Sequence, residues 1–120
     1  MCMYHLMFVD DEVDFLENLK FLFEGDPEFS ISVISDPEKA LQKAIYSKPD
    51  IIFLDVSMPK IDGGELAVAL RENAITKSIP IVFITAIVTS AERGTYGGQI
   101  FLPKPVKSAE IRSLVREILG

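Results

Sequence analysis

The chain has 120 residues, of which 48% are hydrophobic and 25% charged, as is typical of one compact domain large enough to bury a core. Its 12 basic and 18 acidic side chains give a formal net charge of −6, which argues against broad contacts with nucleic acid or an anionic membrane and favours a metal as any strong cationic partner. The single Cys2 excludes an internal disulfide and fits a reducing compartment. We find no signal peptide and no apolar run long enough for membrane insertion, so we expect a cytoplasmic protein.

Short apolar runs alternate with amphipathic segments along the whole chain. The runs expected to form strands are residues 4–9, 29–34, 51–54, 81–84 and 100–102. Helical periodicity is found in residues 13–23, 40–45, 66–70 and 111–119. Most of the strand candidates are too continuously apolar to leave one face in water. The pattern therefore predicts an α/β fold, a five-stranded parallel sheet with right-handed crossovers and helices on both faces.

Polar residues stand where these strands end. They are, in chain order, Asp10, Asp11, Glu12, Asp55, Thr85 and Lys104. Taken singly, each fits a helix cap or an ordinary solvated side chain. Because ligands of open α/β sheets bind outside the carboxyl ends of the strands, their joint placement favours one shared site at this rim.

The motifs around these residues identify a family. Residues 8–12, 55–63, 80–86 and 97–105 resemble the conserved segments of the response-regulator receiver domains of two-component signalling, which include the chemotaxis regulator. The resemblance covers essentially the whole chain. It implies a flavodoxin-like, doubly wound (βα)5 fold with strand order 2-1-3-4-5, and a single receiver domain over residues 1–120 with no output domain visible.

The resemblance also implies a metal site. The ligands carried over from the family are Asp10, Asp11, Asp55 and the backbone carbonyl of Ser57, with Asp10 acting through a water. The expected ion is Mg²⁺, with Mn²⁺ as a substitute. This assignment is physically reasonable, because unit charges about 4 Å apart repel by about 4 kcal/mol at an effective dielectric near 20, and clustered carboxylates need a cation or protons. Mg²⁺ prefers such hard oxygen ligands.

The remaining roles follow from the same resemblance. Asp55 is the expected phosphoryl acceptor, Lys104 the cation that contacts the phosphoryl group, Thr85 the switch hydroxyl and Phe101 the aromatic side chain that turns during the switch. The phosphoryl donor would be a sensor histidine kinase or a phosphotransfer protein. The lone His5 precedes the acids in its strand and is expected to be structural. The domain would catalyse its own phosphorylation and slow dephosphorylation, and would act on a downstream protein or a covalently linked output domain without binding nucleic acid directly.

Three other classes share parts of this pattern. A flavodoxin-like cofactor domain needs a phosphate-binding loop after the first strand, where this chain has acids that repel phosphate. A phosphatase of the haloacid dehalogenase type needs a second acid two residues after its nucleophile, where this chain has Ser57. A pseudo-receiver, acting as a phosphorylation-independent interaction module, normally lacks one or more of the five key positions, all of which are present here.

Three local features lead to further expectations. The Lys104–Pro105 bond is expected to be cis, as it commonly is in receiver domains. In the family, the positions of Ser57 and Ile87 influence the water that hydrolyses the phosphoryl group, and the apolar Ile87 predicts a long phosphoryl lifetime that polar replacements shorten. The segment between Thr85 and Lys104 is shorter than usual. We expect at most two helical turns there and a non-helical or mobile stretch at residues 89–98 in the unphosphorylated protein. Either this stretch becomes ordered on phosphorylation, or the output surface relies more on the last helix.

Overall fold

The computed structural model describes residues 3–56, 63–86, 94–96 and 99–120. Its strands are β1 (Tyr4–Val9), β2 (Phe29–Ile34), β3 (Ile51–Asp55), β4 (Ile81–Thr85), β5 (Gly94–Tyr96) and β6 (Gln99–Pro103). Its helices are α1 (Val13–Phe23), the short 3₁₀ helix η1 (Pro37–Lys39), α2 (Ala40–Ser47), α3 (Gly63–Glu72) and α4 (Ser108–Leu119). The strands form one sheet in the order β2-β1-β3-β4-β6-β5.

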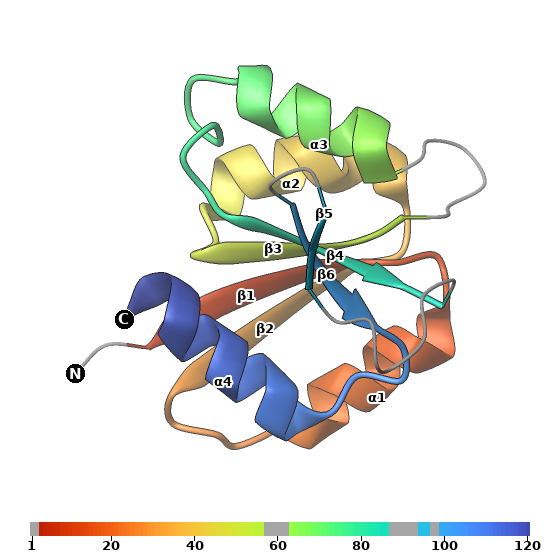
Figure 1. The fold of residues 1–120 in the computed structure, drawn as a ribbon, viewed down its shortest axis with the longest axis vertical. Coiled ribbons are helices and arrows are strands. Elements are labelled where there is room, and N and C mark those ends of the chain that lie inside the picture. The colour runs from red at the N-terminus through yellow and green to blue at the C-terminus, as the bar shows by residue number, and fades with distance from the viewer. Residues whose placement is uncertain (1–2, 57–62, 87–93, 97–98) are drawn as a thin grey trace.

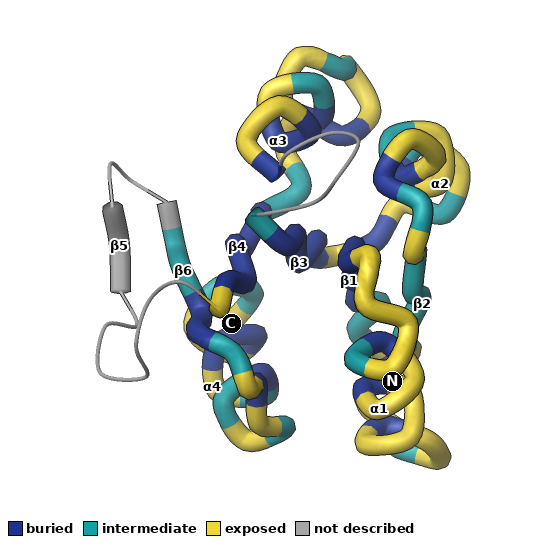
Figure 2. Tube along the Cα trace, turned by 90° about the vertical axis from the view of Figure 1, so that its right-hand side faces the viewer, coloured by how far each residue is buried: buried dark blue, intermediate teal, exposed yellow. Residues whose placement is uncertain are grey.

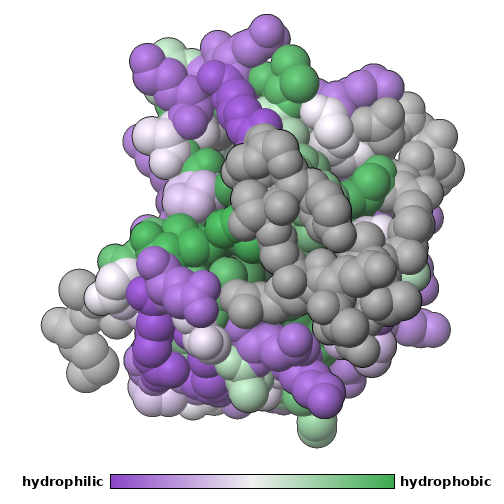
Figure 3. All heavy atoms as spheres, viewed as in Figure 1, coloured by the Kyte–Doolittle hydropathy of each residue, from purple (hydrophilic) through white to green (hydrophobic). Residues whose placement is uncertain are grey.

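The sheet separates two hydrophobic clusters, and Figure 1 shows the helices that cover each. Helices α1 and α4 pack on one face and α2 and α3 on the other. The side chains of successive strand residues point to the two faces in turn. Leu6 and Phe8 belong to the first cluster, and Met7 and Val9 belong to the second. This double burial explains the continuously apolar strands. Figure 3 shows hydrophilic side chains gathered over the outer surfaces of α3 and α4.

The predicted parallel sheet is confirmed. Strands β2, β1, β3, β4 and β6 are parallel neighbours, and they correspond to the expected order 2-1-3-4-5. No helix of the described residues is long and apolar enough to cross a membrane.

The strand β5 was not predicted and corrects the regular (βα)5 repeat. It pairs antiparallel with β6, with Gly94 beside Phe101 and Tyr96 beside Gln99. Glycine weakens a helix, whereas threonine and tyrosine favour strands, so this stretch extends the sheet at its edge. The expected non-helical character is thereby confirmed at residues 94–96, while residues 89–93, 97 and 98 lie outside the described part of the chain.

Two smaller expectations can be compared with the structure. The peptide bond between Lys104 and Pro105 is cis, as predicted.

The ring nitrogen Nε2 of His5 lies 2.7 Å from the hydroxyl of Ser32, and the His5 backbone N–H donates to the Asp50 carboxylate at 2.7 Å. These contacts tie β1 to its neighbours, in agreement with a structural role for His5.

An ion pair links α4 to the turn before β2. The Arg112 guanidinium donates to the Asp26 carboxylate and lies 5.2 Å and 5.1 Å from the ring centroids of Phe23 and Phe29. The carboxylate also accepts the backbone N–H of Glu28 at 2.8 Å. This backbone hydrogen bond first, and then the Arg112 guanidinium, lower the pKa of Asp26 below its usual value.

We predict that Asp26→Asn lowers the melting temperature at pH 7 by a few degrees. A depressed folded-state pKa contributes stability that is fully present above the unfolded value, about 3.9 for aspartate, and is lost as the pH falls through the lower folded value. The difference between variant and wild type should therefore shrink below about pH 4. Thermal unfolding measured from pH 7 downward tests this, with Glu24→Gln on the exposed surface as control; a difference that does not change with pH would contradict it.

Candidate functional site

The strand register brings the acidic residues together at one rim of the sheet. Val9 of β1 lies beside Leu54 of β3, so Asp10 and Asp55 follow on neighbouring parallel strands, which are about 4.8 Å apart. Asp55 in turn lies beside Ile84 of β4, which Thr85 follows. Asp10, Asp55 and Thr85 are buried, with exposed fractions of 1%, 5% and 3%. The predicted convergence at this rim is thus present in the structure.

Three carboxylates form a compact cluster. Asp10, Asp11 and Asp55 each place one oxygen within 4.8 Å of the other two. Asp10 Oδ1 accepts the backbone N–H of Glu12 at 2.9 Å, whereas its Oδ2 is buried without a hydrogen-bond partner among the described residues. Since buried carboxylates in such proximity repel one another and are costly without compensating positive charge, the cluster favours a neighbouring cation.

Lys104 supplies one positive charge to the cluster. Its Nζ lies 2.7 Å from Asp10 Oδ2, a close ion pair whose direction does not meet hydrogen-bond geometry, and 3.8 Å from Asp55 Oδ2. It also donates to Glu12 Oε1 at 2.6 Å and lies 4.6 Å from the centroid of the Phe15 ring. Burial, the largest influence, lowers the pKa of Lys104, but the neighbouring carboxylates together raise it above its usual value. The lysine is therefore cationic at neutral pH.

The donor set fits a hard divalent ion. Three carboxylates with one ammonium leave the cluster net negative. Oxygen ligands of this kind are those that Mg²⁺ prefers, and Mn²⁺ accepts them as well. Asp11 is the exposed member of the three. The expected backbone carbonyl of Ser57 lies outside the described residues, as does Ile87.

Thr85 and Phe101 lie on neighbouring strands of the same rim. Phe101 of β6 is beside Phe83 of β4, and the two rings stack with centroids 5.3 Å apart. Thr85 is two residues beyond Phe83, so the side chains of Thr85 and Phe101 project from the same face of the sheet. The backbone N–H of Lys104 donates to the Thr85 carbonyl at 2.9 Å. The structure therefore places Thr85 and Phe101 on the same face of neighbouring strands and bonds Lys104 to the Thr85 backbone.

Sequence reasoning did not identify the contacts that three neighbours make at the site. Glu12 and Phe15 both contact Lys104; the third acid in the Asp-Asp-Glu run was the available signal for Glu12, while nothing in the sequence singled out Phe15. The third neighbour is Gly63, the first residue of α3. A Cβ there would lie 2.4 Å from the backbone oxygen of Asp55. Gly63 is thus required by the close approach of α3 to the Asp55 backbone.

Comparison with known proteins identifies the family. A sequence model of the response regulator receiver domain matches residues 6–116. The chain belongs to this family. Response regulator Rre1 of Synechocystis is 30% identical over 118 residues, covering 96% of this chain and 51% of that protein. The alkaline phosphatase synthesis transcriptional regulatory protein PhoP of Bacillus subtilis is 32% identical over 117 residues, covering 95% and 48%.

A solved structure supports the fold of this receiver domain. The chemotaxis protein CheY4 of Vibrio cholerae superposes with a TM-score of 0.81 at 24% identity, covering 97% of this chain and 98% of that one. In contrast, the receiver domain spans about half the length of Rre1 and PhoP. The activities of those longer proteins therefore do not transfer to it directly.

We predict that Gly63→Ala destabilises the receiver domain by about 1–3 kcal/mol, the usual cost of overpacking, and weakens Mg²⁺ binding. The added methyl must push the Asp55 backbone away, which displaces a carboxylate of the cluster. Denaturant unfolding and metal titration calorimetry measure the two effects. Gly64→Ala is the matched control, because Gly64 is exposed in α3 and alanine there should stabilise by about 0.5–1 kcal/mol. Unchanged metal affinity in Gly63→Ala would contradict the prediction.

Proposed function

We propose that this receiver domain accepts a phosphoryl group on Asp55 from a phosphohistidine of a sensor histidine kinase or phosphotransfer protein. One observation carries the proposal. Asp55 ends a buried strand with Lys104 Nζ 3.8 Å from its Oδ2 and the carboxylates of Asp10 and Asp11 beside it. A carboxylate held rigidly between a cation and a metal-binding acidic pair is suited to nucleophilic attack on phosphorus.

The transfer conserves atoms and charge in a simple way. One carboxylate oxygen of Asp55 forms the new bond to phosphorus while the phosphorus–nitrogen bond of the donor breaks, and the imidazole leaves with the electron pair and takes up a proton. Lys104 compensates negative charge on the phosphoryl oxygens. Asp10, Asp11 and Asp55, with the Ser57 carbonyl, would hold Mg²⁺, which supplies further charge neutralisation. Water later cleaves the acyl phosphate, slowly if Ile87 lies where the family places it.

The switch would use Thr85 and Phe101. The Thr85 hydroxyl would turn toward the phosphoryl group, and the Phe101 ring would fill the space that it leaves. Phe101 is half-buried against Phe83, so its rotation changes the surface near β6 and α4. This surface would then alter its affinity for a downstream protein or a linked output domain.

The proposed setting follows from the family and from charge. Residues 1–120 form one receiver domain, and a transcriptional role such as the PhoP name describes would reside in other residues. The net charge of −6 makes direct contact between this domain and nucleic acid unfavourable. We place the domain in the cytoplasm, where histidine kinases present their phosphohistidine.

Intact mass measured after incubation with a small phosphodonor and Mg²⁺ tests the proposal. The wild type should gain one phosphoryl group, and Asp55→Asn should gain none because the amide lacks the nucleophilic oxygen. An Asp50→Asn variant, altered outside the cluster, serves as control and should still be labelled. If the wild type gains no mass at saturating metal, the domain is a phosphorylation-independent interaction module instead.

Metal binding can be tested without any donor. Mg²⁺ that binds the folded cluster should raise the melting temperature, with stabilisation increasing by about 1.4 kcal/mol for each tenfold rise in concentration above Kd. Asp11→Ala should remove most of this rise, whereas Asp14→Ala, an exposed acid of α1 outside the cluster, should retain it. An equal rise in both variants would place the ion elsewhere.

A further inference from the structure

Strand β2 forms an edge of the sheet and presents a defined set of backbone groups outward. Its one neighbour in the described sheet is β1, and Figure 2 shows it at the end of the sheet between α2 and α1. The backbone N–H of Tyr4 donates to the Glu28 carbonyl, and that of Asp10 to the Ile34 carbonyl. The backbone N–H and C=O groups of the even-numbered residues of β2 thus point toward β1. By the two-residue alternation of a strand, Ile31 and Val33 direct their N–H and C=O groups away from the sheet.

A groove lies on each side of this edge. The first, which we call the α2 groove, has a volume of about 1030 Å³ and is lined by both Val33 and Ile34. Val33 and Ile34 are the last two residues of β2, so this groove lies beside the end of the strand. The second, the α1 groove, has a volume of about 470 Å³ and is lined by Phe21, Phe23 and Ile31 among others.

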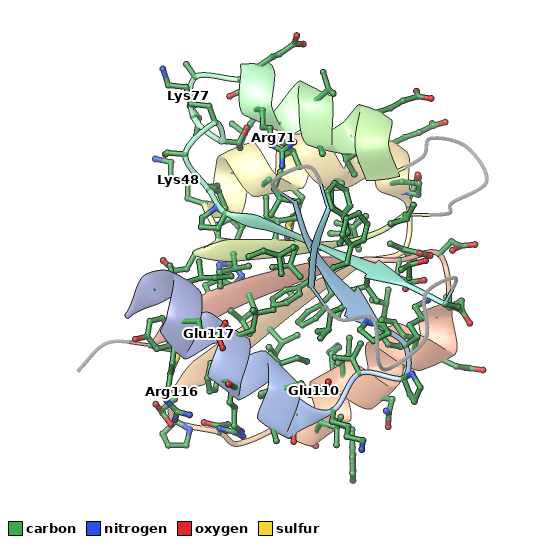
Figure 4. The ribbon with its side chains drawn as sticks, in the orientation of Figure 1. Lys48, Arg71, Lys77, Glu110, Arg116 and Glu117 are labelled. Carbon is green, nitrogen blue, oxygen red and sulfur yellow. The ribbon has the colours of Figure 1, made fainter. Side chains whose placement is uncertain are left out.

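The α2 groove is basic. Lys39, Lys43 and Lys48 line it, against Asp36 as its one acid, and the Asp36 carboxylate already accepts the backbone N–H of Glu38. The three lysines are exposed and form no ion pair within the described part of the chain. Figure 4 shows Lys48 pointing away from the molecule beyond α2. The protein as a whole has a net charge of −6, so the positive charge of this groove is opposite in sign to that of the whole chain.

The α1 groove has the opposite character. Phe21 is 73% exposed there, beside Ile31 and Phe23, and Glu17 and Glu24 outnumber Lys20. Apolar side chains fit this groove and acidic ones are repelled. The two sides of β2 therefore select different chemistry, although the same strand edge joins them.

We propose that β2 is a docking edge for an extended peptide segment of a partner protein in which acidic and apolar residues alternate. The segment adds a strand beside β2 and pairs with the outward backbone groups of Ile31 and Val33. Alternate side chains then point to opposite faces: the acidic ones into the α2 groove, the apolar ones into the α1 groove. Backbone hydrogen bonds give affinity and the two grooves give specificity, as in other cases of strand addition.

Charge excludes a second copy of this chain as occupant. Antiparallel pairing of two β2 edges uses a dyad perpendicular to the sheet, which places the α2 grooves of both copies on the same side. Lys39 and Lys43 of both copies would then lie on the same side of the joined sheet, and like charges there oppose such pairing. Nucleic acid is disfavoured by the net charge and by the exposed acids of the α1 groove.

The test measures binding of a fluorescent peptide of alternating glutamate and valine by anisotropy at low salt. The wild-type domain should bind it, and the double variant Lys39→Glu, Lys43→Glu should bind at least tenfold more weakly. Lys107→Glu with Arg116→Glu carries the same charge change on α4, outside both grooves, and should bind like wild type. All four side chains are exposed, so the variants should fold, and circular dichroism verifies this.

Modified peptides test the strand pairing itself. In one peptide the backbone nitrogens of all glutamates are methylated, and in a second those of all valines. Each modification removes the N–H groups along one edge of the peptide strand, so at least one of the two peptides should lose binding. Retention of binding by both would overturn the proposal, as would equal binding by a peptide with the same residues in block order. Two other results would assign the edge to another occupant and would also overturn the proposal. One is a preference for an oligonucleotide over the peptide. The other is concentration-dependent dimerisation that the lysine variant abolishes. Asp55→Asn should bind the peptide unchanged, which separates this result from the phosphorylation test.

Discussion

The site depends on one electrostatic constraint: buried carboxylates must share a cation. Asp10 and Asp55 are almost fully buried. The Lys104 ammonium forms ion pairs with both and with the exposed carboxylate of Glu12. One ammonium cannot neutralise this many acids, and it lies closer to Asp10 and Glu12 than to Asp55. The remaining negative charge of this cluster suits a divalent cation. Destabilisation at the site and its capacity for chemistry thus have the same origin.

The fold holds these charges where they would not remain by themselves. Parallel strands ending at one level fix Asp10, Asp55 and Thr85 through backbone hydrogen bonds, and the apolar clusters on both faces keep the strands in register. Lys104 is fixed at both ends, through its backbone N–H to Thr85 and through its ammonium over the Phe15 ring. Gly63 allows α3 to begin directly against the Asp55 backbone. Each of these contacts limits the motion of one residue of the rim.

Sequence alone predicted whatever depends on periodicity and strand ends. The apolar runs gave the five parallel strands, and polar residues after them gave the acidic rim with Thr85 and Lys104. It missed the features that arise only when distant segments meet. The contact between Glu12 and Lys104 spans the chain, and the steric need for Gly63 depends on where α3 begins relative to β3. Strand β5 was missed for a related reason: three residues carry too little pattern to indicate a strand without the neighbouring edge of β6.

A backbone hydrogen bond connects the rim to β2, but the two sites share no element that changes conformation. The Asp10 N–H donates to the Ile34 carbonyl at 3.1 Å, so the residue that carries a site carboxylate is bonded to the end of the docking strand. Energetic coupling between two sites requires an element with two arrangements that each site biases differently. A parallel strand pair packed on both faces has one arrangement, because shifting its register would move every side chain to the wrong face. The proposed switch residues, Thr85 and Phe101, lie on β4 and β6, which β1 and β3 separate from β2. Docking at β2 is therefore best understood as constitutive, holding a partner in place whether or not the rim changes state.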